Sequence, residues 1–274
     1  MRITAINLHP VKSGAIRPVS AAPLDPGGLR DDRRWMVVDG DGEAVTARML
    51  PELFRVVADT PVTDPAVTAD LRLGADGQPP LDVTAPSGPP VRVTMFRRHR
   101  MAATLAAPDA HEWIRTVVGR ADLRLVWCHD PSLRRLDPAL ASEHDHAAFP
   151  DNYPVTLASE ASLARLNEWI GGDTPLPMSR FRPNIVVDGE EPFAEDSWSR
   201  LRLGPVGCRV VRSVDRCVMT TIDPTTLAKG PDPLRTLARH RRWDGKTWFA
   251  RHLIPDGTGT VRVGDEVAVL SRTS

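Results

Sequence analysis

Short apolar runs separated by proline and glycine dominate this 274-residue sequence, which contains 26 prolines and 19 glycines. Residues 34–39 (RWMVVD) lead through the turn GDGE into AVTAR, a pattern typical of a β-hairpin with glycine where positive φ is needed. LRL at 71–73 is followed across a turn by LDV at 81–83, and VRVTM at 91–95 alternates at the period of a strand. These patterns predict a mainly β fold of the α+β class, beginning with an antiparallel barrel-like or sandwich domain.

Three segments have the pattern of helices. Apolar side chains recur at helical spacing over residues 109–118, and Gly119 fits the C-terminal stop. A second helix is expected to begin at Ser159 and to end at the glycine pair 171–172. A third, basic helix is expected within PLRTLARHRR, residues 233–242. We therefore expect a few helices around a fold built mainly of strands.

The length of the chain and one polar segment predict two domains. A chain of 274 residues can form two compact domains, each with its own core. The stretch 130–150 is polar, has no period and is expected to be a long loop near the boundary. We expect a first domain over residues 1–125, which includes the helix at 109–118, and a second β domain over residues 126–274.

Charge and hydropathy exclude several classes of partner. Lysine plus arginine and aspartate plus glutamate both number 35, so no global field steers the chain to nucleic acid. The N-terminus lacks the apolar core of a signal peptide, and nowhere do 18 consecutive apolar residues occur. We expect a soluble cytoplasmic protein with no nucleic-acid or membrane partner.

The three cysteines, Cys128, Cys208 and Cys217, lie far apart and form no C-x-x-C pair. This spacing argues against a zinc ribbon, an iron–sulfur cluster and a disulfide framework. Cys128 and Cys208 lie within apolar alternation, which favours packing. His144 and His146 have the spacing of a metal-binding pair, but their polar surroundings favour a solvated loop. The sequence also lacks a nucleophile elbow, an H-E-x-x-H motif and a glycine-rich phosphate loop.

Cys217 lies in the more polar segment SVDRCVMTTIDP, residues 213–224. A cysteine in a strand-like segment is most often a small buried apolar side chain. Here Arg216 would favour the thiolate if its head lies near the sulfur, and Thr220 and Thr221 are polar groups that an apolar core would leave unpaired. A thiolate serves as a nucleophile or as a soft metal ligand. No histidine stands in a recognisable motif with Cys217, and the residues alone leave packing and chemistry both open.

Cations gather in three other segments. Lys12 lies in HPVKSG directly after the first expected strand, and Arg33 lies in DDRRW before the next one. Arg180 and Arg182 lie in SRFRPN, just before Asn184. Arginine binds oxyanions through its planar fork and lysine as a point charge. If the chain brings these segments together, they can bind a phosphate or a polyoxo anion.

These segments, in this order, resemble proteins that join an N-terminal β-barrel to a MOSC domain, named after the C-terminal part of molybdenum-cofactor sulfurases. The resemblance is greatest to bacterial N-hydroxylated-base reductases and mitochondrial amidoxime-reducing components. It extends from Ile3 to Leu270 and is carried by HPVKSG, GLRDDRRWMVVDGDG, LASEASLARLN, RFRPNIVVDGEEPFAEDSW, DRCVMTTIDP and VRVGDEV. Several long segments in fixed order are more specific than one short motif. The resemblance implies an N-terminal β-barrel domain followed by a MOSC β-barrel with a few helices.

The resemblance also implies a molybdenum cofactor, formed by molybdenum and a molybdopterin. Cys217 would bind the metal through its thiolate and would be the catalytic residue, while the pterin dithiolene supplies further sulfur ligands. The positions that hold the cofactor would be Lys12, Ser13, Arg33, Ser159, Arg182, Asn184, Thr220 and Thr221. Because these positions come from both domains, the resemblance places the site at the domain interface.

The sequence departs from the family pattern at three places. Gly14 stands where many relatives have cysteine, and Ala250 stands where glycine is usual. Some bacterial relatives carry a C-terminal [2Fe–2S] domain, which does not follow residue 274 here. We therefore expect a separate electron-donor protein.

The implied function is that of a molybdenum-dependent oxidoreductase. Its small-molecule substrates would be hydroxylamines, amidoximes or N-hydroxylated bases, each reduced to the N–H compound and water. One alternative is a non-redox carrier of the molybdenum cofactor, or a sulfur-transfer protein that forms a persulfide on Cys217. A second alternative is a β-barrel binding module without a metal.

Overall fold

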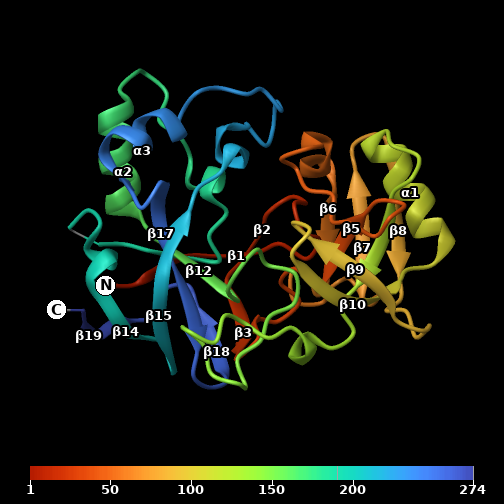
Figure 1. Ribbon diagram of the computed structural model, residues 1–274, viewed down its shortest axis with the longest axis horizontal. Coiled ribbons are helices and arrows are strands. Elements are labelled where there is room, and N and C mark those ends of the chain that lie inside the picture. The colour runs from red at the N-terminus through yellow and green to blue at the C-terminus, as the bar shows by residue number, and fades with distance from the viewer. Residues whose placement is uncertain (190, 274) are drawn as a thin grey trace.

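The computed structural model describes residues 1–189 and 191–273, and it has two parts that lie side by side (Figure 1). The larger part contains a nine-stranded sheet of order β19-β14-β15-β17-β12-β13-β1-β2, in which β16 also pairs with β17. Its strands are β1 (Ile3–Leu8), β2 (Arg17–Val19), β12 (Val155–Ser159), β13 (Ile185–Val187), β14 (Trp198–Leu203), β15 (Val206–Asp215), β16 (Arg242–Trp243), β17 (Lys246–Pro255) and β19 (Val267–Arg272).

A three-stranded sheet packs against this large sheet. It consists of β3 (Ala21–Asp25), β4 (Gly28–Leu29) and β18 (Gly259–Arg262), in the order β18-β3-β4. Leu24 of β3 and Val261 of β18 are buried in one core with Ile6 of β1 and Leu253 of β17. Burying each such side chain stabilises the fold by about 1.5–3 kcal/mol.

The smaller part is built from two sheets and a helix. One sheet has the order β5-β11-β10-β9 and the other β6-β7-β8. The elements are β5 (Trp35–Val38), β6 (Val57–Asp59), β7 (Leu71–Ala75), β8 (Gln78–Val83), β9 (Val91–Met95), β10 (His99–Leu105), α1 (Pro108–Val118) and β11 (Arg124–Trp127). Trp113 and Ile114 of α1 are buried in the same core as Leu71 and Leu73 of β7, so the helix completes this core.

The remaining helices are short. The α-helices are α2 (Glu160–Ile170) and α3 (Leu234–His240), and the 3₁₀ helices are η1 (Pro51–Arg55), η2 (Pro131–Leu133), η3 (Met178–Phe181), η4 (Ala194–Ser197) and η5 (Val218–Thr221). Among the described residues, no helix is both long and apolar enough to cross a membrane.

Most of the expected local structure is confirmed, and the fold is mainly β. Ser159 and Gly171 flank α2, and Gly119 ends α1 with a left-handed φ of 76°. Residues 71–73 pair with 81–83 as expected. The hairpin after β5 differs, because its second arm is reduced to bridges at Glu43 and Ala44 before the chain turns away from the sheet.

The chain crosses between the two parts twice. The strands β1 to β4 belong to the larger part, because β1 pairs with β13 and β3 pairs with β18. The chain then builds the smaller part from β5 to β11 and returns through the long polar loop. A domain boundary between residues 125 and 126 stays a prediction. Strand β1, from the first half of the sequence, pairs with β13 from the second half within the nine-stranded sheet.

Candidate functional site

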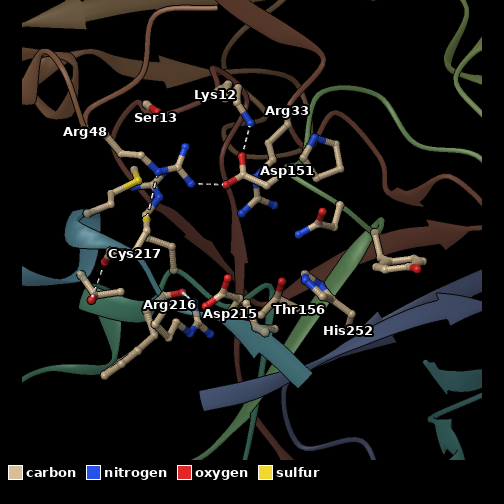
Figure 2. Close-up of a pocket in the computed structure, with 18 of the residues that line it drawn as sticks. Lys12, Ser13, Arg33, Arg48, Asp151, Thr156, Asp215, Arg216, Cys217 and His252 are labelled. Carbon is tan, nitrogen blue, oxygen red and sulfur yellow. Dashed lines mark hydrogen bonds and ion pairs between the residues drawn. The ribbon is translucent and has the colours of Figure 1, made fainter. Parts of the chain in front are cut away.

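A pocket between the two parts gathers most of the polar residues singled out above (Figure 2). The smaller part and the segments that lead into it supply Lys12, Ser13, Arg33 and Arg48. The larger part supplies the wall from strand ends and 3₁₀ helices, with Asp151, Thr156, Arg180, Arg182, Arg216, Cys217, Thr220 and His252 among its residues. Arginine and lysine outnumber acidic side chains in this lining, which therefore suits an anionic ligand.

Cys217 lies at the point where the larger part meets Arg48. It lies two residues after the end of β15 and directly precedes η5, and its side chain is half-buried. The Arg48 guanidinium donates a hydrogen bond from Nε to the Cys217 Sγ at 2.9 Å. This contact places a charged donor on the sulfur, and the thiolate is the form of cysteine that binds metal. Cys128 and Cys208 are buried, and burial raises their pKa values to about 11 and about 12, as expected for packing residues.

Arg48 belongs to a chain of charges that ends at Lys12. Its Nη2 pairs with Asp151, and the Lys12 Nζ pairs with the other oxygen of that carboxylate and donates to the Phe149 carbonyl at 2.7 Å. Burial favours a raised pKa for Asp151, but Lys12 and Arg48 outweigh it and hold that pKa well below its usual range. Burial lowers the pKa of Lys12 to about 8 despite the opposing effect of Asp151. Two cations therefore hold Asp151 as a carboxylate beside Cys217.

Three of the expected cofactor residues have strained backbones. Ser13, Arg33 and Arg182 have φ values of 67°, 50° and 51°, in the left-handed region that non-glycine residues rarely adopt. Each such conformation costs of order 1–3 kcal/mol and persists where the surrounding structure determines it. Backbone strain of this kind clusters at functional sites. All three residues line the same pocket.

Buried polar nitrogens in the pocket wall have no hydrogen-bond partner among the described residues. Nη2 of Arg182, Nη2 of Arg216 and both ring nitrogens of His252 make no hydrogen bond there. Burial lowers the pKa of Arg182 to about 9 and that of Arg216 to about 10. Burial, followed by the charge of Arg216, lowers the pKa of His252 to about 3, so its ring is neutral at pH 7. Unpaired buried polar groups are costly, and these are available to a ligand that enters the pocket.

A buried asparagine and a buried arginine hold the lining in place. Asn184 accepts hydrogen bonds at Oδ1 from Arg33 Nη1 at 3.2 Å and from the Thr156 amide at 3.1 Å. Arg180 donates to the carbonyls of Thr220 at 3.0 Å and Thr221 at 3.3 Å, which fixes η5 directly after Cys217. These two residues therefore position residues that face the pocket.

The expected site residues fall into three groups. The structure brings six of them together around the pocket: Lys12, Ser13, Arg33, Arg182, Cys217 and Thr220. Asn184 lies behind the lining, and Thr221 is buried with its hydroxyl donating to the Val218 carbonyl at 2.8 Å.

Ser159 lies elsewhere. Thr156 lines the pocket, and Ser159 is three residues further along β12, about 10 Å away at the rise of a strand and on the opposite face. Ser159 lines a separate cavity with Glu195 and Trp198. The geometry of this strand therefore places Ser159 away from the pocket that gathers the other expected cofactor residues.

Sequence reasoning missed Arg48, Asp151 and His252. Arg48 ends the expected hairpin arm AVTAR, Asp151 follows the long polar loop, and His252 lies inside a strand. Arg48 is 169 residues from Cys217 and 103 residues from Asp151 in sequence. Contacts over such separations leave no local pattern in a single sequence.

Comparisons with known proteins agree with this architecture. A family model for the MOSC N-terminal β-barrel domain matches residues 1–121, and a model for the MOSC domain matches residues 144–268. Mitochondrial amidoxime-reducing component 1 from Homo sapiens is 32% identical over 97% of this chain and 82% of its own length. Mitochondrial amidoxime reducing component 2 from Homo sapiens is 30% identical over 95% of this chain and 81% of its own length.

Among solved structures, the YUAD protein from Bacillus subtilis aligns with 97% of this chain and 93% of its own, at 11% identity and a TM-score of 0.42. The matches to the two domain models and to the human proteins together cover both parts of the molecule. The chain therefore belongs to the family of proteins that join a MOSC N-terminal β-barrel domain to a MOSC domain, together with the mitochondrial amidoxime-reducing components.

Proposed function

We propose that this protein binds a molybdenum cofactor in the pocket between its two parts and reduces N-hydroxylated compounds. The observation that carries the proposal is the position of the Cys217 Sγ, which receives a hydrogen bond from Arg48 in a pocket rich in buried cations. The names of the human relatives, which describe amidoxime reduction, support the reaction class.

The residues of the pocket fit such a group. Arg182 and Arg216 have buried guanidinium nitrogens that find no hydrogen-bond partner in the described part of the chain, which suits the phosphate of a pterin. Among the described residues, no group of three or more His, Cys, Asp and Glu side chains is arranged to hold a metal. A metal beside Cys217 would therefore depend on the pterin for its other sulfur ligands. Lys12, Ser13, Arg33 and Thr220 complete the proposed binding surface, with Asn184 and Thr221 behind it.

When bound, the cofactor would supply the two-electron chemistry that breaks the N–O bond. The overall reaction consumes two electrons and two protons: R–NHOH + 2 e⁻ + 2 H⁺ gives R–NH₂ + H₂O. The protein's own contribution begins with Cys217, whose thiolate ligates the metal. Arg48 orients the sulfur and balances its charge, and Asp151 holds Arg48 in place from the other side. A separate protein would supply the electrons.

The rival function is a carrier of the cofactor or a sulfur-transfer protein. The half-exposed Cys217 thiol beside Arg48 also has the environment of a reactive thiolate that accepts sulfur as a persulfide. The cytoplasmic location expected from the sequence stays a prediction, since the human relatives are named mitochondrial.

Metal and pterin analysis of the wild type and Cys217→Ser tests the proposal. The wild type, produced with the cofactor supplied, should contain both molybdenum and pterin, and Cys217→Ser should lose the molybdenum. The wild type should also reduce a simple amidoxime with dithionite-reduced methyl viologen. Absence of molybdenum from the folded wild type would refute the proposal. Cofactor without turnover, together with labelling of Cys217 by a sulfur donor, would favour the carrier.

A further inference from the structure

The turn between β9 and β10, taken together with the first two residues of β10, carries a concentrated positive charge. Residues 96–100 read FRRHR, and all five are exposed. Among the described residues, Arg97, Arg98 and Arg100 form no ion pair. The Glu43 carboxylate contacts the backbone of this turn rather than its guanidinium groups, accepting from the Arg97 amide at 3.1 Å and also from the Thr94 hydroxyl. The guanidinium groups of this turn therefore remain available to a partner.

Contacts of Phe96 place this turn beside Lys12 and Arg48, two residues that line the pocket. The Phe96 ring lies 4.9 Å from Arg48 Cζ and 5.5 Å from Lys12 Nζ, measured to the ring centroid. Arg48 in turn donates to the Cys217 sulfur. Phe96 and Arg97 both have left-handed φ values, 58° and 54°, so the turn holds a specific conformation over these cations. The basic turn and Cys217 are thus separated by two side-chain contacts.

Exposed apolar side chains accompany the basic turn. Met49, Val218 and Phe96 are 56%, 45% and 37% exposed. Met49 and Val218 are the chain neighbours of Arg48 and Cys217, and the Phe96 ring packs on Arg48, so each is one residue or one side-chain contact from that pair. An apolar centre with a charged rim is the anatomy of a protein–protein interface. We call Met49, Phe96, Arg97, Arg98, Arg100 and Val218 the mouth surface.

We infer that the mouth surface is the docking site for an acidic electron-transfer protein. This inference rests on the proposed reductase function, which needs two electrons per turnover from outside the chain. Redox partners form small, weak interfaces, and opposite charge raises their rate of encounter. Docking here brings the partner beside the side chain proposed to ligate the metal. Two one-electron donors, each oxidised once, balance the conversion of R–NHOH and two protons to R–NH₂ and water.

Other occupants agree less well with the same surface. Nucleic-acid binding takes a wide basic face, whereas the chain has zero net charge and this turn offers three arginines around apolar side chains. A small anionic substrate would bind to groups in the pocket, and none of the three arginines lines it. A protein partner with acidic side chains can pair with the arginines and also cover the exposed apolar side chains.

Charge reversal on the turn tests the inference. The test variant is Arg97→Glu/Arg98→Glu, and the matched control is Arg202→Glu/Arg262→Glu, which reverses two exposed arginines of the larger part that do not line the pocket. The donor is a reduced, acidic plant-type [2Fe–2S] ferredoxin, and the acceptor is a simple amidoxime. At low ionic strength we expect the test variant to lose at least about tenfold in kcat/KM for ferredoxin, with KM for the amidoxime unchanged. The control should stay within about twofold of the wild type.

Salt and a small reductant separate docking from catalysis. The wild-type rate with ferredoxin should fall as ionic strength rises from about 0.01 to about 0.15 M, and the test variant should respond less. Both variants should keep the wild-type rate with reduced methyl viologen. The inference would be overturned if the ferredoxin-dependent kcat/KM fell equally in the test and control variants, or fell in neither. It would also be overturned if the test variant lost as much activity with methyl viologen as with ferredoxin.

Direct binding distinguishes failure of this inference from failure of the proposed function. Ferredoxin binding to the wild type and to both variants is measured by calorimetry at low ionic strength, with or without cofactor in the protein. Binding that depends on Arg97 and Arg98 supports the surface even if the protein proves inactive as a reductase. Absence of such binding, or tighter binding of duplex DNA that depends on the same arginines, rejects it.

Discussion

The Arg48 guanidinium joins the Cys217 thiol to the Asp151 carboxylate, with Nε donating to Sγ at 2.9 Å and Nη2 pairing with the carboxylate. Burial alone would lower the pKa of Arg48, but Asp151 and the Cys217 sulfur outweigh it and raise that pKa. The guanidinium therefore stays charged while it contacts a carboxylate and a sulfur from different segments. This geometry uses the planar fork of arginine, which lysine lacks.

Substitution of Arg48 should weaken metal binding. Arg48→Ala removes both contacts, and Arg48→Lys keeps the charge but cannot bridge the two partners. Loss of a residue that orients a metal ligand typically costs 10- to 100-fold in metal affinity, and we expect a loss of about that size for Arg48→Ala and a smaller one for Arg48→Lys. The molybdenum-to-protein ratio after dialysis against a competing chelator measures this loss of metal affinity. Arg55→Ala, an exposed arginine in the following 3₁₀ helix, is the control, and an equal loss there would contradict the bridge.

Asp151→Asn should lower stability and change its dependence on pH. Removing the carboxylate leaves Lys12 buried without its ion pair, which we expect to cost about 1–3 kcal/mol, less than for a fully buried pair because the Asp151 side chain is 37% exposed. The folded pKa of Asp151 lies below its unfolded value of 3.8, so this stabilisation is present at neutral pH and is lost as pH falls below about 4.

Urea unfolding of the wild type and Asp151→Asn at pH 7, 5 and 3 measures this effect. The difference in free energy of unfolding should be similar at pH 7 and 5 and smaller at pH 3. Asp215→Asn is the control, since Asp215 also lines the pocket but is paired only with Lys246 at 4.0 Å. A pH-independent difference for Asp151→Asn would show that the lost interaction is not the ion pair.

Local patterns in the sequence predicted much of the fold, because each pattern depends on residues that are close together in the chain. The helical period over 109–118 and the alternation in β9 each follow from neighbouring side chains, and both elements formed there. The pairing of β1 with β13 joins residues more than 170 positions apart, and no local pattern marks it. For the same reason the motifs pointed to Lys12 and Cys217, while the side chains that connect them, Arg48 and Asp151, emerged only from the folded chain.

Removal of the Arg182 side chain and removal of the Ser159 side chain should have different effects on the pterin content of the protein. Arg182 Nη2 is a buried donor without a hydrogen-bond partner in residues 1–189 and 191–273, whereas Ser159 lines a separate cavity. Arg182→Ala should lower the pterin content at least about tenfold, as expected for loss of a charge-assisted hydrogen bond of about 1.5–3 kcal/mol. Ser159→Ala should leave the pterin content unchanged. Near-ultraviolet circular dichroism checks that both variants are folded, and a pterin loss in Ser159→Ala would return that residue to the cofactor site.

His252 should make the protein less stable as the solution becomes acidic. The buried ring has no hydrogen-bond partner among the described residues, and its pKa is lowered from 6.5 to about 3. The folded protein therefore keeps the ring neutral while the unfolded chain takes up a proton below pH 6.5, so stability falls between pH 6.5 and pH 3 by about 1.4 kcal/mol per pH unit. The His252→Gln side chain cannot titrate, so its free energy of unfolding should fall with decreasing pH less steeply than that of the wild type, by about 1.4 kcal/mol per pH unit. Part of the pH dependence should remain, because the pKa of His9 is lowered in the same way. His144→Gln, whose side chain is 87% exposed, should retain the full wild-type slope. Denaturant unfolding at pH 6 and pH 5 measures the three slopes, and identical slopes for the wild type and His252→Gln would mean that the ring is not buried in its neutral form.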